Sequence, residues 1–150
     1  MGMKKILLGV LLGLLLCPIK CQAYQPQHAI EISYKDAQML LKVAQAEAGN
    51  QGFVGQWLVI CCVWNRVLSD EFPSTVEEVL YQDGQFSTVA NGSFDKAEPT
   101  ADTHYALAYF EQGNRAEKII AFESAKSQSL EKYFWRAFEY RDHVFYTMKQ

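Results

Sequence analysis

The sequence predicts a single, mainly α-helical domain of the α+β class with a small β-hairpin near its C-terminus. Apolar residues recur at helical spacing in two stretches between positions 34 and 69. Polar capping residues open shorter helices further along, and two segments rich in β-branched and aromatic residues lie after position 117. A length of 150 residues allows one domain with a substantial core.

The first helix is predicted over 34–48. Ser33 is a polar cap followed three residues later by an acid, which is a variant of the capping box. Glu47 lies one turn after Val43, so it shares the apolar face of this helix. Gly49 is predicted to end the helix, because glycine commonly takes the left-handed conformation at that position.

The second helix is predicted over 53–69. It is apolar nearly all round from 57 to 64, so it should be the central buried helix. Gln56 and Asn65 are its polar breaks, and a polar group there must be hydrogen-bonded or face a cleft. Both interpretations stay open for Gln56, whereas Asn65 is expected to cap a neighbouring backbone group.

The remaining elements are shorter. A second capping box, from Ser74 to Glu77, opens a helix that ends near Tyr81. The other expected elements are a helix over 101–112, a strand over 118–122, a helix or irregular wall over 129–138, and a strand over 143–147 that pairs with the first strand.

Residues 1–23 have the features of a secretory signal peptide. Two lysines precede an unbroken run of apolar residues and glycine, and small residues occupy the two cleavage-site positions. The run is too short for a permanent transmembrane helix. An uncleaved anchor is one alternative, and a lipoprotein modified at Cys17 is another, which the bulky Leu16 disfavours. We therefore expect one exported domain over 24–150, secreted or held in the cell wall, with no stable membrane span after signal removal.

The charge argues against nucleic acid as a partner. The whole chain has a formal net charge of −3, and the signal peptide carries three lysines and no acidic residue. The exported part therefore has a formal charge of −6. Phosphate backbones repel such a protein.

Cysteine and histidine usage predicts neither a thiol nucleophile nor a metal site. Cys61 and Cys62 are adjacent in an apolar helix, where their side chains diverge, so they are expected to be small core residues. The three histidines lie far apart and show no ligand-pair spacing. No metal and no cofactor is expected.

Glu47 is the carboxylate that the sequence singles out for chemistry. A carboxyl on a buried helix face loses solvation, and near a helix C-terminus it meets the negative end of the helix dipole. Both effects raise its pKa, which suits a general acid working near neutral pH. A partly exposed glutamate in a frayed last turn is the alternative.

Three blocks resemble the SleB/CwlJ-type cell wall hydrolases, the spore cortex-lytic family. The first is AEAGNQGFVGQWLVICCVWNRV at 46–67, beside a family pattern of approximately AEARGEPYEGQVAVAAVVLNRV. The second is FPSTVEEVLYQDGQFSTVANG at 72–92, and the third is HVFY at 143–146. The blocks occur in the family's order and span most of the chain after the leader.

The resemblance implies a lysozyme-like fold and a lytic transglycosylase that cleaves the MurNAc–GlcNAc bond of peptidoglycan glycan strands. One acid, here Glu47, would protonate the glycosidic oxygen and then accept the proton of the substrate's C6 hydroxyl, giving an anhydro product. Plain core packing is the alternative for each aromatic in the site. The expected substrate-binding residues are Gln56, Tyr81, Gln85, Phe86 and Ser87, with His143 and Tyr146 on the opposite wall.

The chain departs from the family pattern near the expected acid. Gln51 replaces the family's second acid, while Gly49, Gly52 and Asp83 replace an arginine and two prolines. These changes leave open a family member that binds peptidoglycan, or has a structural role, without cleaving it. Another alternative is a glycosidase that uses the same acid with an activated water, helped by Asp83 or Asp95. A need for an accessory protein also stays open.

Overall fold

The chain folds into a helical body followed by a three-stranded sheet, in a computed structural model that describes residues 29–127 and 129–149. The predicted signal peptide, residues 1–23, lies outside the described residues, and none of the described helices is long and apolar enough to cross a membrane. The helices are α1 (Tyr34–Ala48), α2 (Gly52–Val67), α3 (Val76–Tyr81), α4 (Ser87–Ala90), α5 (Ser93–Lys96) and α6 (Ala101–Glu111). The strands are β1 (Ile119–Ser124), β2 (Phe134–Tyr140) and β3 (His143–Met148), with the 3-10 helix η1 (Leu130–Lys132) before β2.

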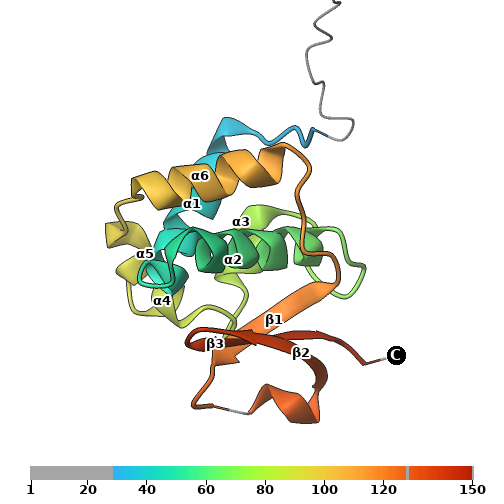
Figure 1. The fold of residues 1–150 in the computed structure, drawn as a ribbon. Helices are drawn as coiled ribbons and strands as arrows, with labels where there is room; N and C mark the ends of the chain where they lie inside the picture. Colours follow the sequence, from blue (N-terminus) through green and yellow to red (C-terminus); the bar gives the residue numbers. More distant parts are fainter. Residues whose placement is uncertain (1–28, 128, 150) are drawn as a thin grey trace, which may run out of the picture.

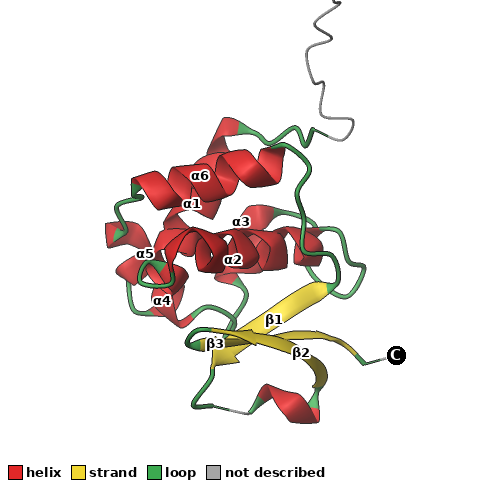
Figure 2. Ribbon diagram, viewed as in Figure 1, coloured by secondary structure: helices red, strands yellow, loops and turns green. Residues whose placement is uncertain are grey.

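Helix α2 is the centre of the molecule, as its almost wholly apolar sequence predicts. It packs against α1, α6 and β1, and so lies between the other long helices and the sheet (Figures 1 and 2). Asn65 near its end donates hydrogen bonds to the carbonyl oxygens of Ala116 and Ile119, both at 2.8 Å. Asn65 therefore caps neighbouring backbone, as predicted, and fastens α2 to the start of β1.

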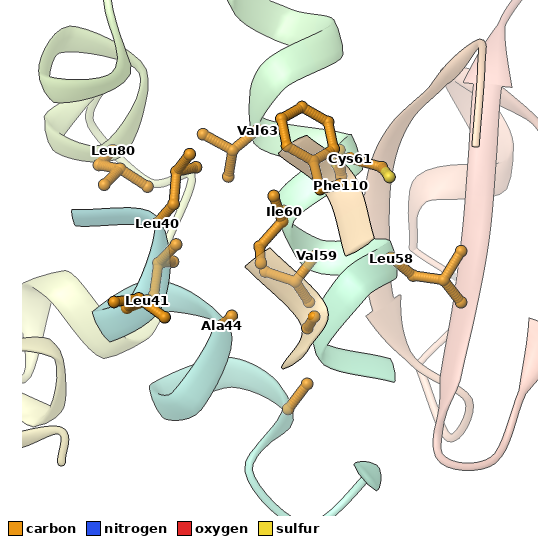
Figure 3. Close-up of a cluster of buried hydrophobic side chains, with 14 of the residues drawn as sticks. Leu40, Leu41, Ala44, Leu58, Val59, Ile60, Cys61, Val63, Leu80 and Phe110 are labelled. Atoms are coloured by element: carbon orange, nitrogen blue, oxygen red, sulfur yellow. The ribbon is translucent and has the colours of Figure 1, made fainter. Parts of the chain in front are cut away.

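The core forms where the helices of the body meet, and Figure 3 shows part of it in close-up. Apolar side chains from α1 and α6 face the central helix α2, which is buried nearly all round. Burial of such side chains supplies most of the favourable free energy of folding. The fully buried members include Leu40, Val43, Ala44, Val59, Ile60, Val63 and Phe110.

Two cysteines lie inside this core, as the sequence predicts. Cys61 and Cys62 are both fully buried on α2 and form no disulfide. Burial raises the pKa of the Cys61 thiol to about 12 and that of Cys62 to about 11. Both thiols therefore stay protonated and behave as small apolar residues.

The sheet has the strand order β1–β3–β2, and both pairings are antiparallel. Phe122 pairs with Phe145, which confirms the predicted pairing of the first and last strands. The prediction of a helix or irregular wall over 129–138 is wrong for its second half, because β2 begins at Phe134, while the first half contains the short 3-10 helix η1. Nearly all of β2 is exposed at the sheet edge, so it lacks the alternation of buried and exposed residues that identifies a strand in a sequence.

The helix caps lie at or beside their predicted positions. Ser33 accepts a hydrogen bond from the backbone N–H of Asp36 and caps α1 as predicted. The second cap is one residue later than predicted, since Thr75 rather than Ser74 accepts the bond, from the backbone N–H of Glu78. The hydroxyl of either residue type can cap a helix, so the sequence does not fix which one does.

The left-handed turn between α1 and α2 lies at Gly52, not at Gly49 as predicted. Gly49 has a right-handed φ of −57°, whereas Gly52 has a φ of 67°. Glycine adopts this left-handed region readily, while proline is held near −65°. The glycine that replaces the family's proline is therefore a requirement of the turn in this chain.

Candidate active site

A cleft of about 730 Å³ lies between the helical body and the sheet. It forms where the last turn of α1, the loop after α3 and strand β1 meet. Its helical wall consists of Glu47, Arg66, Phe72, Gly84, Gln85 and Ser87. Its sheet wall consists of Ala121, Phe122, Glu123, Ser124, Ser127, Ser129, Leu130, Tyr133, Phe134 and His143.

Glu47 lies in the last turn of α1 and presents its carboxyl to the cleft. Burial raises the pKa of this carboxyl, which is the direction that its place on the apolar face predicts. Thr88 of α4 donates a hydrogen bond to Glu47 Oε1 and lowers the pKa in part, without cancelling the effect of burial. Glu47 is therefore a half-buried carboxyl that holds its proton to higher pH than an exposed glutamate.

Glu123 on β1 is a second carboxyl in the same cleft, and its surroundings are the opposite. Its Oε1 accepts hydrogen bonds from the Tyr146 hydroxyl at 2.6 Å and the Leu130 N–H at 3.0 Å. Its Oε2 accepts from the N–H and the hydroxyl of Ser129, at 3.1 and 2.7 Å. Partial burial alone would raise the pKa of Glu123, but these hydrogen bonds, above all that from Tyr146, outweigh it and lower the pKa to about 2.

Three of the predicted substrate-binding residues lie in the cleft. Gln85 and Ser87 belong to the helical wall, and His143 belongs to the sheet wall. The His143 ring lies 5.3 Å from the Phe122 ring, and burial lowers the pKa of its imidazole, which is therefore mainly neutral at pH 7. These side chains offer hydrogen-bonding groups on both sides of Glu47's cleft.

The other four predicted substrate-binding residues are not part of either wall. Tyr81 lies at the end of α3 and is 54% exposed. Phe86 is buried, and Gln56 is 1% exposed on α2, with an Oε1 that has no hydrogen-bond partner among the described residues. Tyr146 is fully buried and reaches the cleft only through its bond to Glu123.

Arg66 is a wall residue that the sequence does not single out as functional, although it belongs to the first family-like block. It is only 5% exposed, and no carboxylate of the described residues lies within 4.0 Å of it. Its Nε donates to the Ile120 carbonyl and its Nη1 donates to Gln85 Oε1. A charged residue inside an apolar helix is the one sequence signal that could have identified it.

The sequence also does not single out Glu123, which lines the cleft, or Thr88, which donates a hydrogen bond to Glu47. Thr88 reaches Glu47 across 41 residues of sequence, and Tyr146 reaches Glu123 across 23. Neither pairing follows from local periodicity, because each depends on how distant elements pack. No signal in the sequence could have found them.

Gln51, which stands where the family has its second acid, lies outside the cleft walls. It is 2% exposed, its Nε2 donates to Asp142 Oδ2 at 3.0 Å, and its Oε1 accepts from the Asp142 N–H at 3.2 Å. These bonds join the loop before α2 to the turn between β2 and β3. Gln51 is therefore a structural clasp between the helical body and the sheet.

Residues 50–146 match the family model described as Cell Wall Hydrolase, which is well over half of the chain. The chain belongs to this cell wall hydrolase family. The matched range contains most of both cleft walls and begins just after Glu47. A spore cortex-lytic enzyme of Bacillus cereus is 33% identical over 60 residues, which is 40% of this chain but only 23% of that relative.

Two solved structures share the fold of this cell wall hydrolase. The catalytic domain of the germination-specific lytic transglycosylase SleB from Bacillus anthracis superposes with a TM-score of 0.68 at 22% identity, covering 77% of this chain and 97% of that one. The Bacillus cereus SleB catalytic domain also gives 0.68, at 21% identity, covering 78% of this chain and 93% of that one. The predicted SleB-type family and the lysozyme-like helical fold are thus confirmed.

Proposed function

We propose that this cell wall hydrolase degrades peptidoglycan as a lytic transglycosylase, cleaving the MurNAc–GlcNAc bond with Glu47 as its single acid/base. The observation that carries the proposal is Glu47 in the wall of the cleft, with a pKa raised by burial. A protonated carboxyl can give its proton to the glycosidic oxygen. The resulting carboxylate then takes the proton of the C6 hydroxyl as that oxygen attacks the anomeric carbon, so no water is consumed.

The departures from the family pattern do not count against catalysis. The amide of Gln51 is engaged with Asp142 outside the cleft walls, so an acid missing at this position removes nothing from the cleft. Gly52 is required by the left-handed turn. A peptidoglycan-binding protein without turnover remains the rival, but none of the substituted residues, Gly49, Gln51, Gly52 and Asp83, lines the cleft walls.

Hydrolysis by an activated water is the second candidate, because Glu123 places another carboxylate in the cleft. Asp83 and Asp95, the helpers considered from sequence, are exposed and do not line the cleft walls. A carboxylate with a pKa of about 2 is a weak general base, since proton affinity falls with pKa. We therefore favour the transglycosylase reaction, which needs only Glu47.

The decisive experiment is mass spectrometry of purified peptidoglycan digested with the protein. Anhydro-muramyl ends are expected from the transglycosylase reaction. Reducing ends would establish hydrolysis and overturn the single-acid mechanism. Full binding of peptidoglycan without any product would establish the non-catalytic rival.

We extend the proposal to location, with residues 1–23 removed on export and the domain acting outside the cytoplasm on glycan strands. The support is the basic start, short apolar run and small-residue site of the leader. N-terminal sequencing of exported protein should begin at or near Tyr24. Recovery of Met1 on that material would contradict the proposal.

A further inference from the structure

The guanidinium of Arg66 is buried in the helical wall of the cleft and is not exposed on its surface. Its centre lies 5.1 Å from the ring centroid of Phe72 and 5.2 Å from that of Phe86. Its Nε donates to the Ile120 carbonyl, and its Nη1 donates to Gln85 Oε1 at 3.0 Å. Two aromatic faces and two hydrogen bonds therefore hold the guanidinium plane in one position.

This arrangement determines which end of the Gln85 amide faces the cleft. A guanidinium has only donors, so it can bond the amide oxygen of Gln85 but never its NH2 group. Gln85 is itself exposed and lines the cleft, and none of the described residues accepts a hydrogen bond from its Nε2. The NH2 group is therefore the end that Arg66 leaves for a ligand.

We infer that Arg66 is a positioning residue that makes Gln85 a fixed hydrogen-bond donor to an acetamido carbonyl of the glycan. The inference rests on the proposed function, which supplies a glycan as the ligand. A carbonyl oxygen only accepts hydrogen bonds, so it matches a fixed donor, whereas a sugar hydroxyl could pair with either end of an amide. Gln85 thereby selects N-acetylated sugars over sugars that carry an amine.

The variant Gln85→Glu tests this polarity directly. One carboxylate oxygen still accepts from Arg66, now as a charged pair, so the variant should fold at least as well as the parent. The other oxygen presents an acceptor where the parent presents a donor. It should repel the acetamido carbonyl and attract the ammonium group of a de-N-acetylated sugar.

The measurement compares purified peptidoglycan, the same material after chemical N-deacetylation, and the deacetylated material after re-N-acetylation. Pelleting with the insoluble wall gives binding, and release of soluble fragments gives turnover. The parent should prefer both N-acetylated samples. In Gln85→Glu the ratio of activity on N-acetylated wall to activity on deacetylated wall should fall at least about tenfold, because one hydrogen bond to the acetamido carbonyl is lost and a negative charge faces it. The variant should then prefer the deacetylated sample.

Two further variants complete the test. Gln38→Glu adds the same charge on an exposed site of α1 outside the cleft walls, and it should keep the parent's preference. Arg66→Met removes the donor that orients the amide, so the preference should weaken without reversing. A structural role of Arg66 alone would lower stability without changing the ratio between N-acetylated and deacetylated wall.

An unchanged preference in Gln85→Glu, or a parent that does not distinguish the samples, overturns the inference. The inference also fails if the preference depends on the stem peptides of the wall. In that case the parent would no longer distinguish N-acetylated from deacetylated glycan strands once the peptides are removed. A parent that binds with N-acetyl preference but yields no product would overturn the proposed cleavage and leave this inference standing. Absence of both binding and cleavage would overturn both.

Discussion

The two walls of the cleft each carry one glutamate, and the two glutamates are held in opposite states. Glu47 on the helical wall accepts one hydrogen bond from a side chain, and burial raises its pKa. Glu123 on the sheet wall accepts four hydrogen bonds from three residues, and its pKa is about 2. Paired carboxyls whose pKa values are pushed apart by their surroundings typically have different tasks.

In the proposed mechanism the helical wall supplies the chemistry and the sheet wall supplies the shape of the cleft. Glu47 can release and recover a proton because few groups stabilise its anion. Glu123 stays ionised at neutral pH, and the groups that donate hydrogen bonds to it come from β3 and from the segment before β2. Glu123 therefore holds the sheet wall in shape, while Glu47 is the acid of the proposed reaction.

The largest expected effect is that of Glu47→Gln. The amide keeps the shape and can still accept the Thr88 hydrogen bond, but it has no acidic proton to give. Release of soluble fragments from purified peptidoglycan should fall at least about a hundredfold, the low end for lost general acid–base catalysis. Binding should survive, and thermal stability should hold or rise because a neutral amide is easier to bury.

Glu117→Gln is the matched control, since Glu117 is exposed before β1 and outside the cleft walls. It should cleave at the parent rate. A folded Glu47→Gln protein that binds peptidoglycan and cleaves it at near the parent rate would show that Glu47 is not the acid of the reaction.

The pH dependence of cleavage is the next largest effect. Because burial raises the pKa of Glu47, kcat/KM should stay high to a pH above that at which an exposed carboxyl loses its proton. It should then fall about tenfold per pH unit once the proton is lost. For stability, the neutral Glu47 form contributes fully below its unfolded pKa, and the contribution is lost as pH rises through the raised folded pKa. A kcat/KM profile that falls near pH 4, the range of exposed carboxyls, would place the acid elsewhere.

The variant Gln51→Glu probes the clasp that joins the two walls. It removes the donor to Asp142 Oδ2 and sets a buried carboxylate beside the exposed carboxylate of Asp142. Unfolding by denaturant near neutral pH should show a loss of about 1 to 3 kcal/mol, with turnover per folded molecule unchanged. Adding Asp142→Asn restores a donor and should recover most of the loss.

Higher turnover in Gln51→Glu would contradict this account. It would show that the position contributes to chemistry and that the parent is a weakened family member. The double variant separates the two explanations, because Asp142→Asn should affect stability and not turnover.

The smallest expected effect is that of Glu123→Gln. The amide oxygen can still accept the Tyr146 hydrogen bond, but the NH2 group cannot accept those from Ser129. The free energy of unfolding near neutral pH should therefore fall by about 1 to 2 kcal/mol, a modest value because the carboxyl is partly exposed. A lowered folded pKa contributes stability above the unfolded value of about 4.3, and the contribution is lost as pH falls toward about 2. The difference from the parent should therefore shrink between these pH values. A loss of turnover as large as that of Glu47→Gln would give Glu123 a catalytic task.

The helical wall was the more predictable half of the molecule. Ser33 and the apolar spacing around Glu47 are local signals, so they predict α1 and the raised pKa of its carboxyl. Asn65 is a polar residue in an apolar helix, and its need for a partner predicts the cap that it makes. Helix periodicity acts over a few residues, and the need of a buried polar group for a partner shows at its own position, although the sequence does not identify the partners Ala116 and Ile119.

The sheet wall was less predictable because its order depends on contacts between distant residues. Strand β2 is an exposed edge strand, and without alternation its aromatic residues fit a helix equally well. Glu123 is recognised as an anchor only when Tyr146 is placed beside it by the register of β1 with β3. The helical wall has one such contact as well, since the bond between Arg66 and Gln85 follows from no periodicity.

The buried thiols of Cys61 and Cys62 can report how often helix α2 separates from its neighbours. With pKa values of about 12 and about 11 they form almost no thiolate at neutral pH, and no solvent reaches them while α2 stays packed. An alkylating reagent can therefore label them only in molecules whose central helix has separated from its neighbours. The ratio of their labelling rate to that of a free thiol gives the opening free energy of the helical body without an introduced reporter residue.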